Sequence, residues 1–213
     1  MTDVVWLLRH GNRADFVDST WRERAELPDD PPLSSDGVEQ AKRAAHRLSS
    51  EGITRIYASP FLRTIQTAHL VAEVLELPVL VEPGLGEHLS PAWFRGPPTL
   101  HGIPTLLREY PRVSNEHEPL ASAQFPESTE DAYRRAAATV RALAERSPGP
   151  MLCVGHGASV TGAAVHLAGG SDRENLCPLA GLFLLVREGG RWMARLRGET
   201  SHLDSSQGAD RYF

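Results

Sequence analysis

The sequence of 213 residues is poor in cysteine and has no long apolar run. Its two cysteines, Cys153 and Cys177, form no CxxC pair, which argues against a disulfide framework and fits a reducing compartment. No stretch approaches the roughly 20 apolar residues that a membrane-spanning helix needs. Asp3 stands where a signal peptide would carry basic residues. We therefore expect a cytoplasmic protein with no membrane contact.

Excess positive charge is also missing. The formal net charge is −5 and the sequence pI is about 6.0, which argues against a general binder of nucleic acid. The nine histidines show no HExxH motif or comparable ligand spacing, so we expect no metal and no cofactor. The length fits one domain over residues 1–213, large enough to bury about 70% of its unfolded surface without disulfide or metal support.

Strand-like and helix-like segments alternate along the chain. Apolar runs predict strands over 3–9, 54–59, 79–83 and 150–156, followed by a hairpin over 182–197. Apolar periodicity predicts helices over 34–52, 59–77, 128–147 and 158–169, and we expect Ser59 to cap the second with Pro60 in its first turn. This alternation predicts the α/β class, a three-layer α/β/α domain with a mostly parallel sheet and helices on both faces.

The alternation lapses between Pro83 and Ser128. This stretch is rich in proline and weakly periodic, with one helix expected around 99–110. A connection of this length in a compact domain is usually a lid or a substrate-facing segment. We therefore expect a cap-like insertion at about 84–127, and a second substrate-facing loop over 16–33.

Two histidines leave apolar strands beside glycines. They occur in Arg9-His10-Gly11 and Gly155-His156-Gly157. Ligands of open parallel sheets sit at the carboxyl ends of the strands, so the two histidines would share one crevice if their strands are neighbours. A single histidine at a strand end is usually structural, but two of them beside arginines favour a functional site.

Arginines accompany these histidines. Arg63 stands in the first turn of the second predicted helix, where a positive charge opposes the helix dipole. Taken alone, it has the ordinary explanation of a solvated surface residue. Together with Arg9 and Arg13 it would form a fork-shaped site for a tetrahedral dianion such as phosphate, which helix N-termini also favour.

A candidate proton donor follows the third strand. Glu87 lies in GLGEH, at the same expected sheet edge. A glutamate in a glycine-rich loop is most often a solvated surface charge. Beside a bound phosphate, like-charge repulsion and desolvation would raise its pKa and keep it protonated for a leaving oxygen.

Five separated motifs together resemble the histidine phosphatase (phosphoglycerate-mutase-like) superfamily. They are RHG, LSSDGVEQA, SPFLRTIQTA, GLGEH and GHG, in the order and spacing of that family. The chain is most similar to the branch of suppressor-of-T-cell-receptor-signalling phosphatase domains and ecdysteroid-phosphate phosphatases, whose motifs match residues 9–15, 30–34, 58–68 and 81–87. It departs from that branch at Asn12, where glutamate is common, and at His88, where an aromatic residue is usual. These departures leave the choice of substrate open.

The resemblance implies a metal-independent phosphomonoesterase. It makes His10 the nucleophile that forms phosphohistidine and Glu87 the general acid. It places the phosphate between Arg9, Arg13, Arg63 and His156, with His156 expected to be protonated and the second ring nitrogen of His10 held by a backbone carbonyl. The expected partner is a small-molecule or peptide phosphomonoester, and dimers in this family leave a homodimer open.

Two alternative functions use the same residues. One is phosphoryl transfer of the phosphoglycerate-mutase type, and the other is a non-catalytic phosphate-binding module. The RHG-x-R-x-D form resembles the phosphatase branch more than the RHG-x-S-x-x-N form of the mutases. Each candidate catalytic position carries a chemically competent residue, so hydrolysis is the favoured interpretation.

Overall fold

The structure is a computed structural model that describes residues 1–204. A seven-stranded sheet has the order β4-β3-β2-β5-β1-β6-β7. Its strands are β1 (Val4–Arg9), β2 (Arg55–Ala58), β3 (Val79–Val81), β4 (Val113–Ser114), β5 (Met151–Gly155), β6 (Leu182–Glu188) and β7 (Arg191–Glu199). From β4 to β1 the paired strands run parallel, whereas β6 and β7 pair antiparallel.

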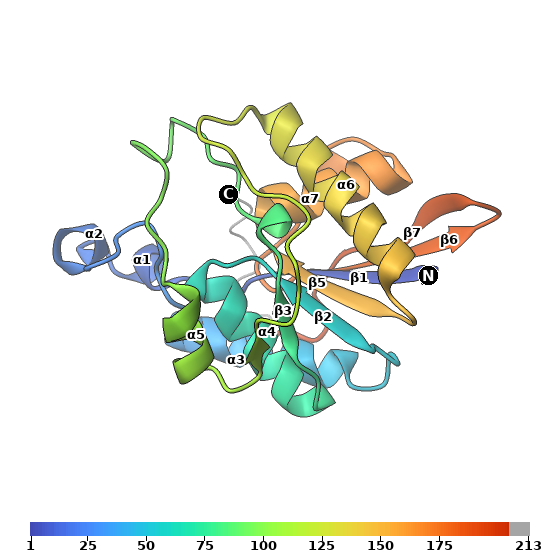
Figure 1. Ribbon diagram of the computed structural model, residues 1–213, viewed down its shortest axis with the longest axis horizontal. Coiled ribbons are helices and arrows are strands. Elements are labelled where there is room, and N and C mark those ends of the chain that lie inside the picture. The colour runs from blue at the N-terminus through green and yellow to red at the C-terminus, as the bar shows by residue number, and fades with distance from the viewer. Residues whose placement is uncertain (205–213) are drawn as a thin grey trace.

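Helices cover both faces of this sheet. They are α1 (Ala14–Val17), α2 (Trp21–Arg24), α3 (Ser35–Leu48), α4 (Leu62–Leu75), α5 (Ile103–Glu109), α6 (Thr129–Arg146) and α7 (Gly157–Ala168), with the 3-10 turns η1 (Pro83–Leu85) and η2 (Arg173–Asn175). Helices α6 and α7 lie on one face of the sheet, and α3, α4 and α5 lie on the other (Figure 1). The predicted three-layer α/β/α class is therefore confirmed.

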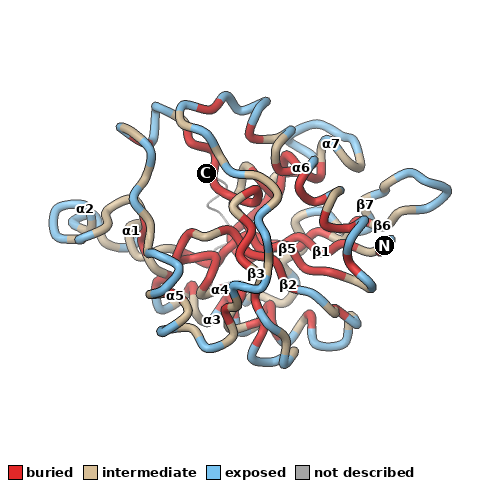
Figure 2. Tube along the Cα trace, viewed as in Figure 1, coloured by how far each residue is buried: buried red, intermediate tan, exposed pale blue. Residues whose placement is uncertain are grey.

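The interior strand β1 contributes side chains to the two apolar cores, one on each face of the sheet. Side chains alternate across a strand, so Trp6 and Leu8 join the core under α3 and α4. Val5 and Leu7 join the core under α6 and α7. All four side chains are at most 1% exposed, and the sheet region is the most continuously buried part of the trace (Figure 2). A strand buried on both faces reads as an unbroken apolar run, as this one does.

The N-terminal boundary of α4 differs from the prediction. The helix begins at Leu62 with Phe61 as N-cap, so Ser59 is not the cap and Pro60 precedes the helix. The amide of Leu62 instead donates to the carboxylate of Asp30 (2.7 Å), which comes from the loop before α3. A distant carboxylate thus satisfies a helix-end donor that local capping would otherwise serve. Ser34 and Ser128 do cap α3 and α6, as their positions indicate.

Two short helices and one short strand were not predicted, and neither were the 3-10 turns η1 and η2. Helices α1 and α2 lie in the loop over 16–33 or just before it, and β4 pairs with β3 inside the segment 84–127. None exceeds four residues, which is too short for a periodic signal. The expected helix around 99–110 is α5. The role of the segment 84–127 as a cap remains a prediction.

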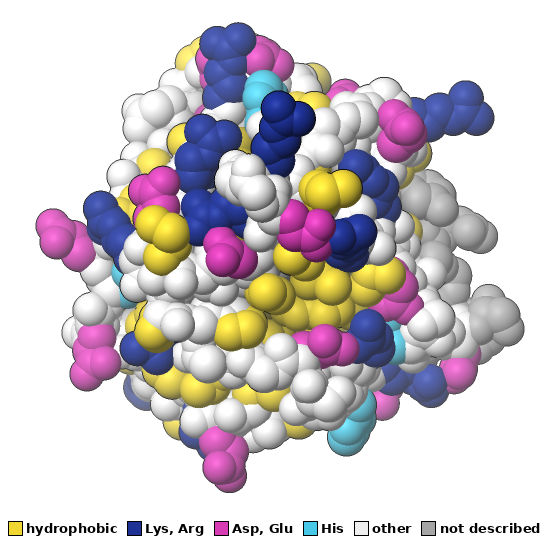
Figure 3. All heavy atoms as spheres, turned by 90° about the vertical axis from the view of Figure 1, so that its right-hand side faces the viewer, with side chains coloured by type: hydrophobic (Ala, Val, Ile, Leu, Met, Phe, Trp, Pro, Cys, Tyr) yellow, Lys and Arg dark blue, Asp and Glu magenta, His cyan; other side chains and the backbone are white. Residues whose placement is uncertain are grey.

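The β6–β7 hairpin projects beyond the helices (Figure 1). On the face that carries it, basic and acidic side chains are interspersed around an apolar area (Figure 3). Ion pairs on this hairpin include Arg195 with Glu188, and Arg187 with Asp3. Charges along a hairpin hinder edge-to-edge pairing more than they stabilise the fold. Within residues 1–204, no helix is long and apolar enough to cross a membrane.

Candidate active site

The two candidate histidines meet because their strands are neighbours. In the parallel pairing of β1 with β5, Arg9 stands opposite Gly155. The next residues, His10 and His156, then leave the sheet together, and the His10 amide donates to the Gly155 carbonyl (3.1 Å). The two rings are fully buried, with centroids 5.3 Å apart. The predicted convergence at the carboxyl edge of the sheet is observed.

His10 presents one ring nitrogen to the crevice. Its Nδ1 lies 2.7 Å from the carbonyl oxygen of Gly11, which makes Nδ1 the protonated nitrogen and leaves a lone pair on Nε2. Arg63 Nε donates to this Nε2 (3.3 Å). Burial lowers the pKa of His10 well below its usual value, and the positive charge of Arg63 lowers it further. His10 is therefore a neutral imidazole with a fixed tautomer, which is the nucleophilic form.

Arg63 joins the other site residues. Its Nη2 lies 3.1 Å from His156 Nδ1 and 3.4 Å from Glu87 Oε2. The side chain is 1% exposed, and burial lowers its pKa to about 10, so it stays charged at neutral pH. Its Nη1 is buried and has no hydrogen-bond partner among the described residues. A buried cationic donor without a partner indicates that an anion completes its hydrogen bonding.

Glu87 and His156 form a coupled pair whose pKa values are both lowered in the protein by itself. Burial acts to raise the pKa of Glu87, but the hydrogen bond to His156 and the positive charge of Arg63 outweigh it and hold that pKa well below its usual value. Burial lowers the pKa of His156 to about 4. In the field of these residues, Glu87 is a carboxylate and His156 is neutral. The expectation of a protonated His156 concerns the complex with phosphate and stays a prediction.

A bound phosphate dianion would act against both of these pKa shifts. Two unit charges about 4 Å apart interact by about 4 kcal/mol at an effective dielectric constant near 20. A dianion placed between Arg63 and Glu87 would raise the pKa of the Glu87 carboxyl and of His156 together. The predicted rise in the pKa of Glu87 is therefore expected only in the complex with phosphate.

The other two arginines occupy different positions. Arg9 is 4% exposed, and its Nη1 donates to the carbonyl of Cys177 (2.7 Å), so the guanidinium is fixed. Its Cζ lies 3.4 Å from where a Cβ on Gly157 would be, which shows how closely it packs against the start of α7. Arg13 lies nearer the surface, where it pairs with Asp15. Its charge still contributes to the lowered pKa of His10.

Sequence reasoning missed several residues that hold the site. The Oγ of Ser59 lies 2.8 Å from His156 Nε2, which fixes that ring. The Phe61 ring packs edge-on against His156 and under the guanidinium of Arg63. Thr67 Oγ1 accepts from the Gly11 amide (3.2 Å). All lie within or beside the motif SPFLRTIQTA, so their motif membership was the available signal.

Gly11 has a packing role. A Cβ at this position would lie 2.4 Å from the carbonyl oxygen of Gly37 in α3. Only glycine allows the chain after β1 to approach α3 so closely. This contact sets the path of the backbone between His10 and Arg13.

The ligand atoms of His10, Glu87 and His156 lie within 4.8 Å of one another, close enough to ligate a metal ion. Sequence spacing could not reveal this cluster, because its members come from three segments. The guanidinium of Arg63 already contacts all three and carries a positive charge there. That charge opposes a second cation and favours an anion.

Comparison with known proteins gives one family. A family model described as the histidine phosphatase superfamily (branch 1) matches residues 5–200. Ubiquitin-associated and SH3 domain-containing protein A of Homo sapiens is 29% identical over 209 residues, covering 80% of this chain and 32% of that protein. The ecdysteroid-phosphate phosphatase of Drosophila melanogaster is 28% identical over 213 residues, covering 80% of this chain and 27% of that protein. The chain thus spans less than a third of the length of these curated relatives.

A solved structure shares the fold. The ecdysone phosphate phosphatase from Bombix mori, in complex with tungstate, superposes with a TM-score of 0.73 at 21% identity. The match covers 95% of each chain. The two proteins therefore share one overall fold.

Proposed function

Because this chain belongs to the histidine phosphatase superfamily (branch 1), as its motifs indicate, we propose that it hydrolyses phosphomonoesters through a phosphohistidine on His10, with Glu87 as proton donor. One observation carries the proposal. The neutral His10 Nε2 faces the buried Arg63 guanidinium, whose Nη1 has no partner among the described residues. A tetrahedral anion placed there meets both a nucleophile and a cationic donor.

The first step transfers the phosphoryl group to the enzyme. The Nε2 lone pair attacks phosphorus in line with the leaving oxygen, and the P–O bond breaks with its electron pair on that oxygen. Arg9, Arg63 and His156 hold the non-bridging oxygens, and Arg13 adds charge from the rim. Glu87, protonated in the field of the substrate dianion, gives its proton to the leaving oxygen.

The second step releases phosphate. The Glu87 carboxylate takes a proton from water as the water oxygen attacks phosphorus, and the N–P bond breaks with its electron pair returning to His10 Nε2. Inorganic phosphate leaves, and His10 regains its neutral tautomer through the Gly11 carbonyl. The side-chain cations supply the charge that metal ions supply in other phosphoryl-transfer enzymes.

We expect the loops around the site to determine which leaving groups the protein accepts. Trp21 and Leu62 line a pocket of about 500 Å³ beside α4, and none of the candidate phosphate-site residues lines it. We expect aromatic or apolar esters among the substrates. Cytoplasmic location and a homodimer stay predictions.

A substrate panel tests the proposal. Pure protein should release inorganic phosphate from at least one member of a set containing p-nitrophenyl phosphate, phosphotyrosine peptides, sugar phosphates, nucleotides and steroid phosphates. Interconversion of 2- and 3-phosphoglycerate without phosphate release would favour the mutase alternative. Phosphate binding without turnover of any ester would favour the non-catalytic module.

The pH dependence follows from His10. An ordinary histidine with a pKa near 6.5 would be only about 3% neutral at pH 5. Because burial and Arg63 lower the pKa of His10 well below that value, its nucleophilic form persists at pH 5. We expect kcat/KM for p-nitrophenyl phosphate, compared at equal dianion concentration, to change less than about threefold between pH 7 and 5. A fall of about 30-fold would contradict this assignment.

A further inference from the structure

Glu87 lies in a loop, on neither a helix nor a strand. It follows η1, and the backbone before it is held by short turns in which Leu85 and Gly86 donate to Glu82 and Pro83. A proton donor must stay within hydrogen-bond reach of the leaving oxygen, about 2.6–3.2 Å. A misplacement of about 1 Å can cost about 100-fold in rate. Some other part of the protein must therefore fix this loop.

Arg135 of α6 makes that connection. Its Nη1 donates to the carbonyls of Gly84 (2.8 Å) and Gly86 (3.2 Å), and its Nη2 donates to the carbonyl of Glu87 itself (3.2 Å). The same guanidinium pairs with both carboxylate oxygens of Glu127, at 2.7 and 2.8 Å. All three of its nitrogens are used. Only arginine offers five donors in a rigid planar fork that can serve a carboxylate and a loop at once.

Glu127 holds the other side of the same loop through its backbone. Its amide donates to the Leu89 carbonyl (3.1 Å), and its carbonyl accepts from His88 Nε2 (2.8 Å). The loop over 84–89 is thus bonded by Arg135 before and at Glu87, and by Glu127 after it. Neither residue contributes an atom to the cluster around His10.

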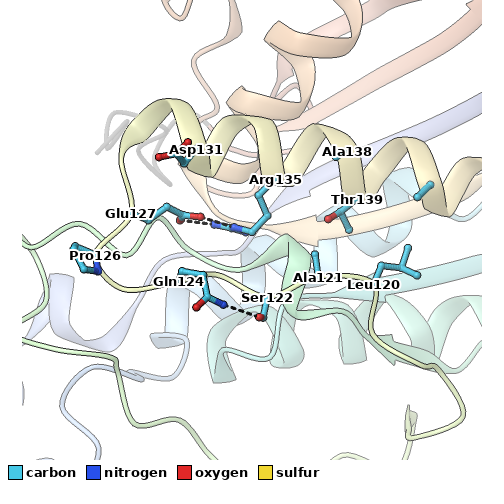
Figure 4. A pocket seen from close by; sticks show the side chains of 11 residues that line it. Leu120, Ala121, Ser122, Gln124, Pro126, Glu127, Asp131, Arg135, Ala138 and Thr139 are labelled. Atoms are coloured by element: carbon cyan, nitrogen blue, oxygen red, sulfur yellow. Dashed lines mark hydrogen bonds and ion pairs between the residues drawn. The ribbon is translucent and has the colours of Figure 1, made fainter.

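The pair is buried although it borders a pocket. The side chains of Arg135 and Glu127 are 8% and 5% exposed. They line a pocket of about 580 Å³ between α6 and the segment that contains Gln124 and Pro126, where Figure 4 shows their two parallel bonds. A buried charge without its partner is costly, so each residue holds the other in place.

We propose that Arg135, braced by Glu127, is a positioning residue that fixes the Glu87 carboxyl at the leaving oxygen. The proposal rests on the hydrolytic function proposed above. It assigns to α6, on the opposite side of the loop from the reacting atoms, the geometry of the general acid. It also separates phosphate affinity from the positioning of the general acid, because Arg9, Arg63 and His156 hold the phosphate without Arg135.

The test compares Arg135→Lys with Arg134→Lys. Lysine keeps the charge at position 135 but cannot reach the three carbonyls and Glu127 together. Arg134 is the matched control, since it directly precedes Arg135 in the same helix, has a 69% exposed side chain and pairs with Glu130 on the helix surface. Each variant is assayed with p-nitrophenyl phosphate and with an alkyl phosphate, together with the inhibition constant of inorganic phosphate.

We expect Arg135→Lys to lower kcat/KM for the alkyl phosphate by about 30-fold or more, because an alkoxide needs the positioned proton. The loss on p-nitrophenyl phosphate should stay within about threefold, and so should the change in phosphate inhibition. Arg134→Lys should match the wild type on both substrates. Equal losses on both substrates for Arg135→Lys would mean a merely structural role and overturn the proposal.

A second variant and a double-mutant cycle keep the test decisive. If Arg135→Lys does not fold, Glu127→Gln, which keeps the shape and removes the charge, should show the same substrate-selective loss. In a Glu87→Gln background, Arg135→Lys or Glu127→Gln should cost nothing further on the alkyl phosphate. Additive losses would contradict positioning. Wild-type protein inactive on every ester would instead overturn the hydrolytic function, and this proposal with it.

Discussion

Replacing His10 with alanine is expected to lower turnover of every phosphomonoester by at least about 10⁴-fold, because it removes the Nε2 lone pair that attacks phosphorus. Arg9, Arg63 and His156 would still bind phosphate, so the inhibition constant of inorganic phosphate should change far less than kcat. The measurement is the rate of phosphate release under saturating p-nitrophenyl phosphate. Activity of His10→Ala near the wild-type level would sink the nucleophile assignment.

The control for this variant is another histidine. His46 is exposed on α3 and touches none of the site residues discussed above, so His46→Ala should keep full activity. Circular dichroism should show that both variants are folded at the assay temperature. A separate chemical test is acid-quenched wild-type enzyme, which should carry acid-labile, base-stable phosphate that His10→Ala lacks. Phosphate trapped on a serine would overturn the mechanism.

The part of this site that the sequence predicts depends on sheet geometry. Buried apolar runs identify β1 and β5, and parallel strands end at one edge, so the sequence predicts His10 and His156 at the same sheet edge, and close together if their strands are neighbours. The same rule placed Glu87 after β3 and Arg63 at the start of α4. These predictions needed only the direction of each strand and its burial, and a local run of apolar residues indicates both.

Contacts between distant segments were not predictable in this way. The start of α4 is set by Asp30, about thirty residues earlier, and not by the adjacent Ser59, which bonds to His156 instead. Local helix propensity does not indicate whether the first amides of α4 will bond to the adjacent Ser59 hydroxyl or to the Asp30 carboxylate from another segment. In the sequence, nothing distinguishes Arg135 from the other arginines of its helix, because the carbonyl groups that it binds lie on a loop some 50 residues earlier in the chain.

Protonation states were the least predictable property. The raised pKa predicted for Glu87 depends on a bound phosphate, whereas in the protein by itself Arg63 and His156, both within 3.4 Å, hold that pKa low. The outcome depends on distances of a few tenths of an ångström in a buried site, where the effective dielectric constant is low. A sequence motif names the groups but carries none of these distances.

Replacing Glu87 with glutamine is expected to lower kcat/KM for alkyl phosphates by about 10³-fold, the usual contribution of a positioned acid. The same variant should keep kcat/KM for p-nitrophenyl phosphate within about tenfold, because that leaving group needs little protonation. Glutamine preserves the shape and the hydrogen-bonding ability of the side chain but has no proton to transfer. The measurement is kcat/KM for the two esters, which reports the steps up to phosphoryl transfer and excludes later hydrolysis.

The second role of Glu87 gives an independent signature. If the carboxylate also activates water, hydrolysis of phosphohistidine slows in Glu87→Gln while its formation from p-nitrophenyl phosphate does not. Stopped-flow mixing should then show a burst of nitrophenolate equal to the enzyme concentration, followed by slow turnover, and acid quenching should trap phosphate on His10 in nearly every molecule. Equal losses of kcat/KM on both esters with no burst would count against Glu87 as either acid or base. The burst distinguishes a residue that moves the proton in both steps from one that only shapes the pocket, because a shaping residue would slow formation of the intermediate as well.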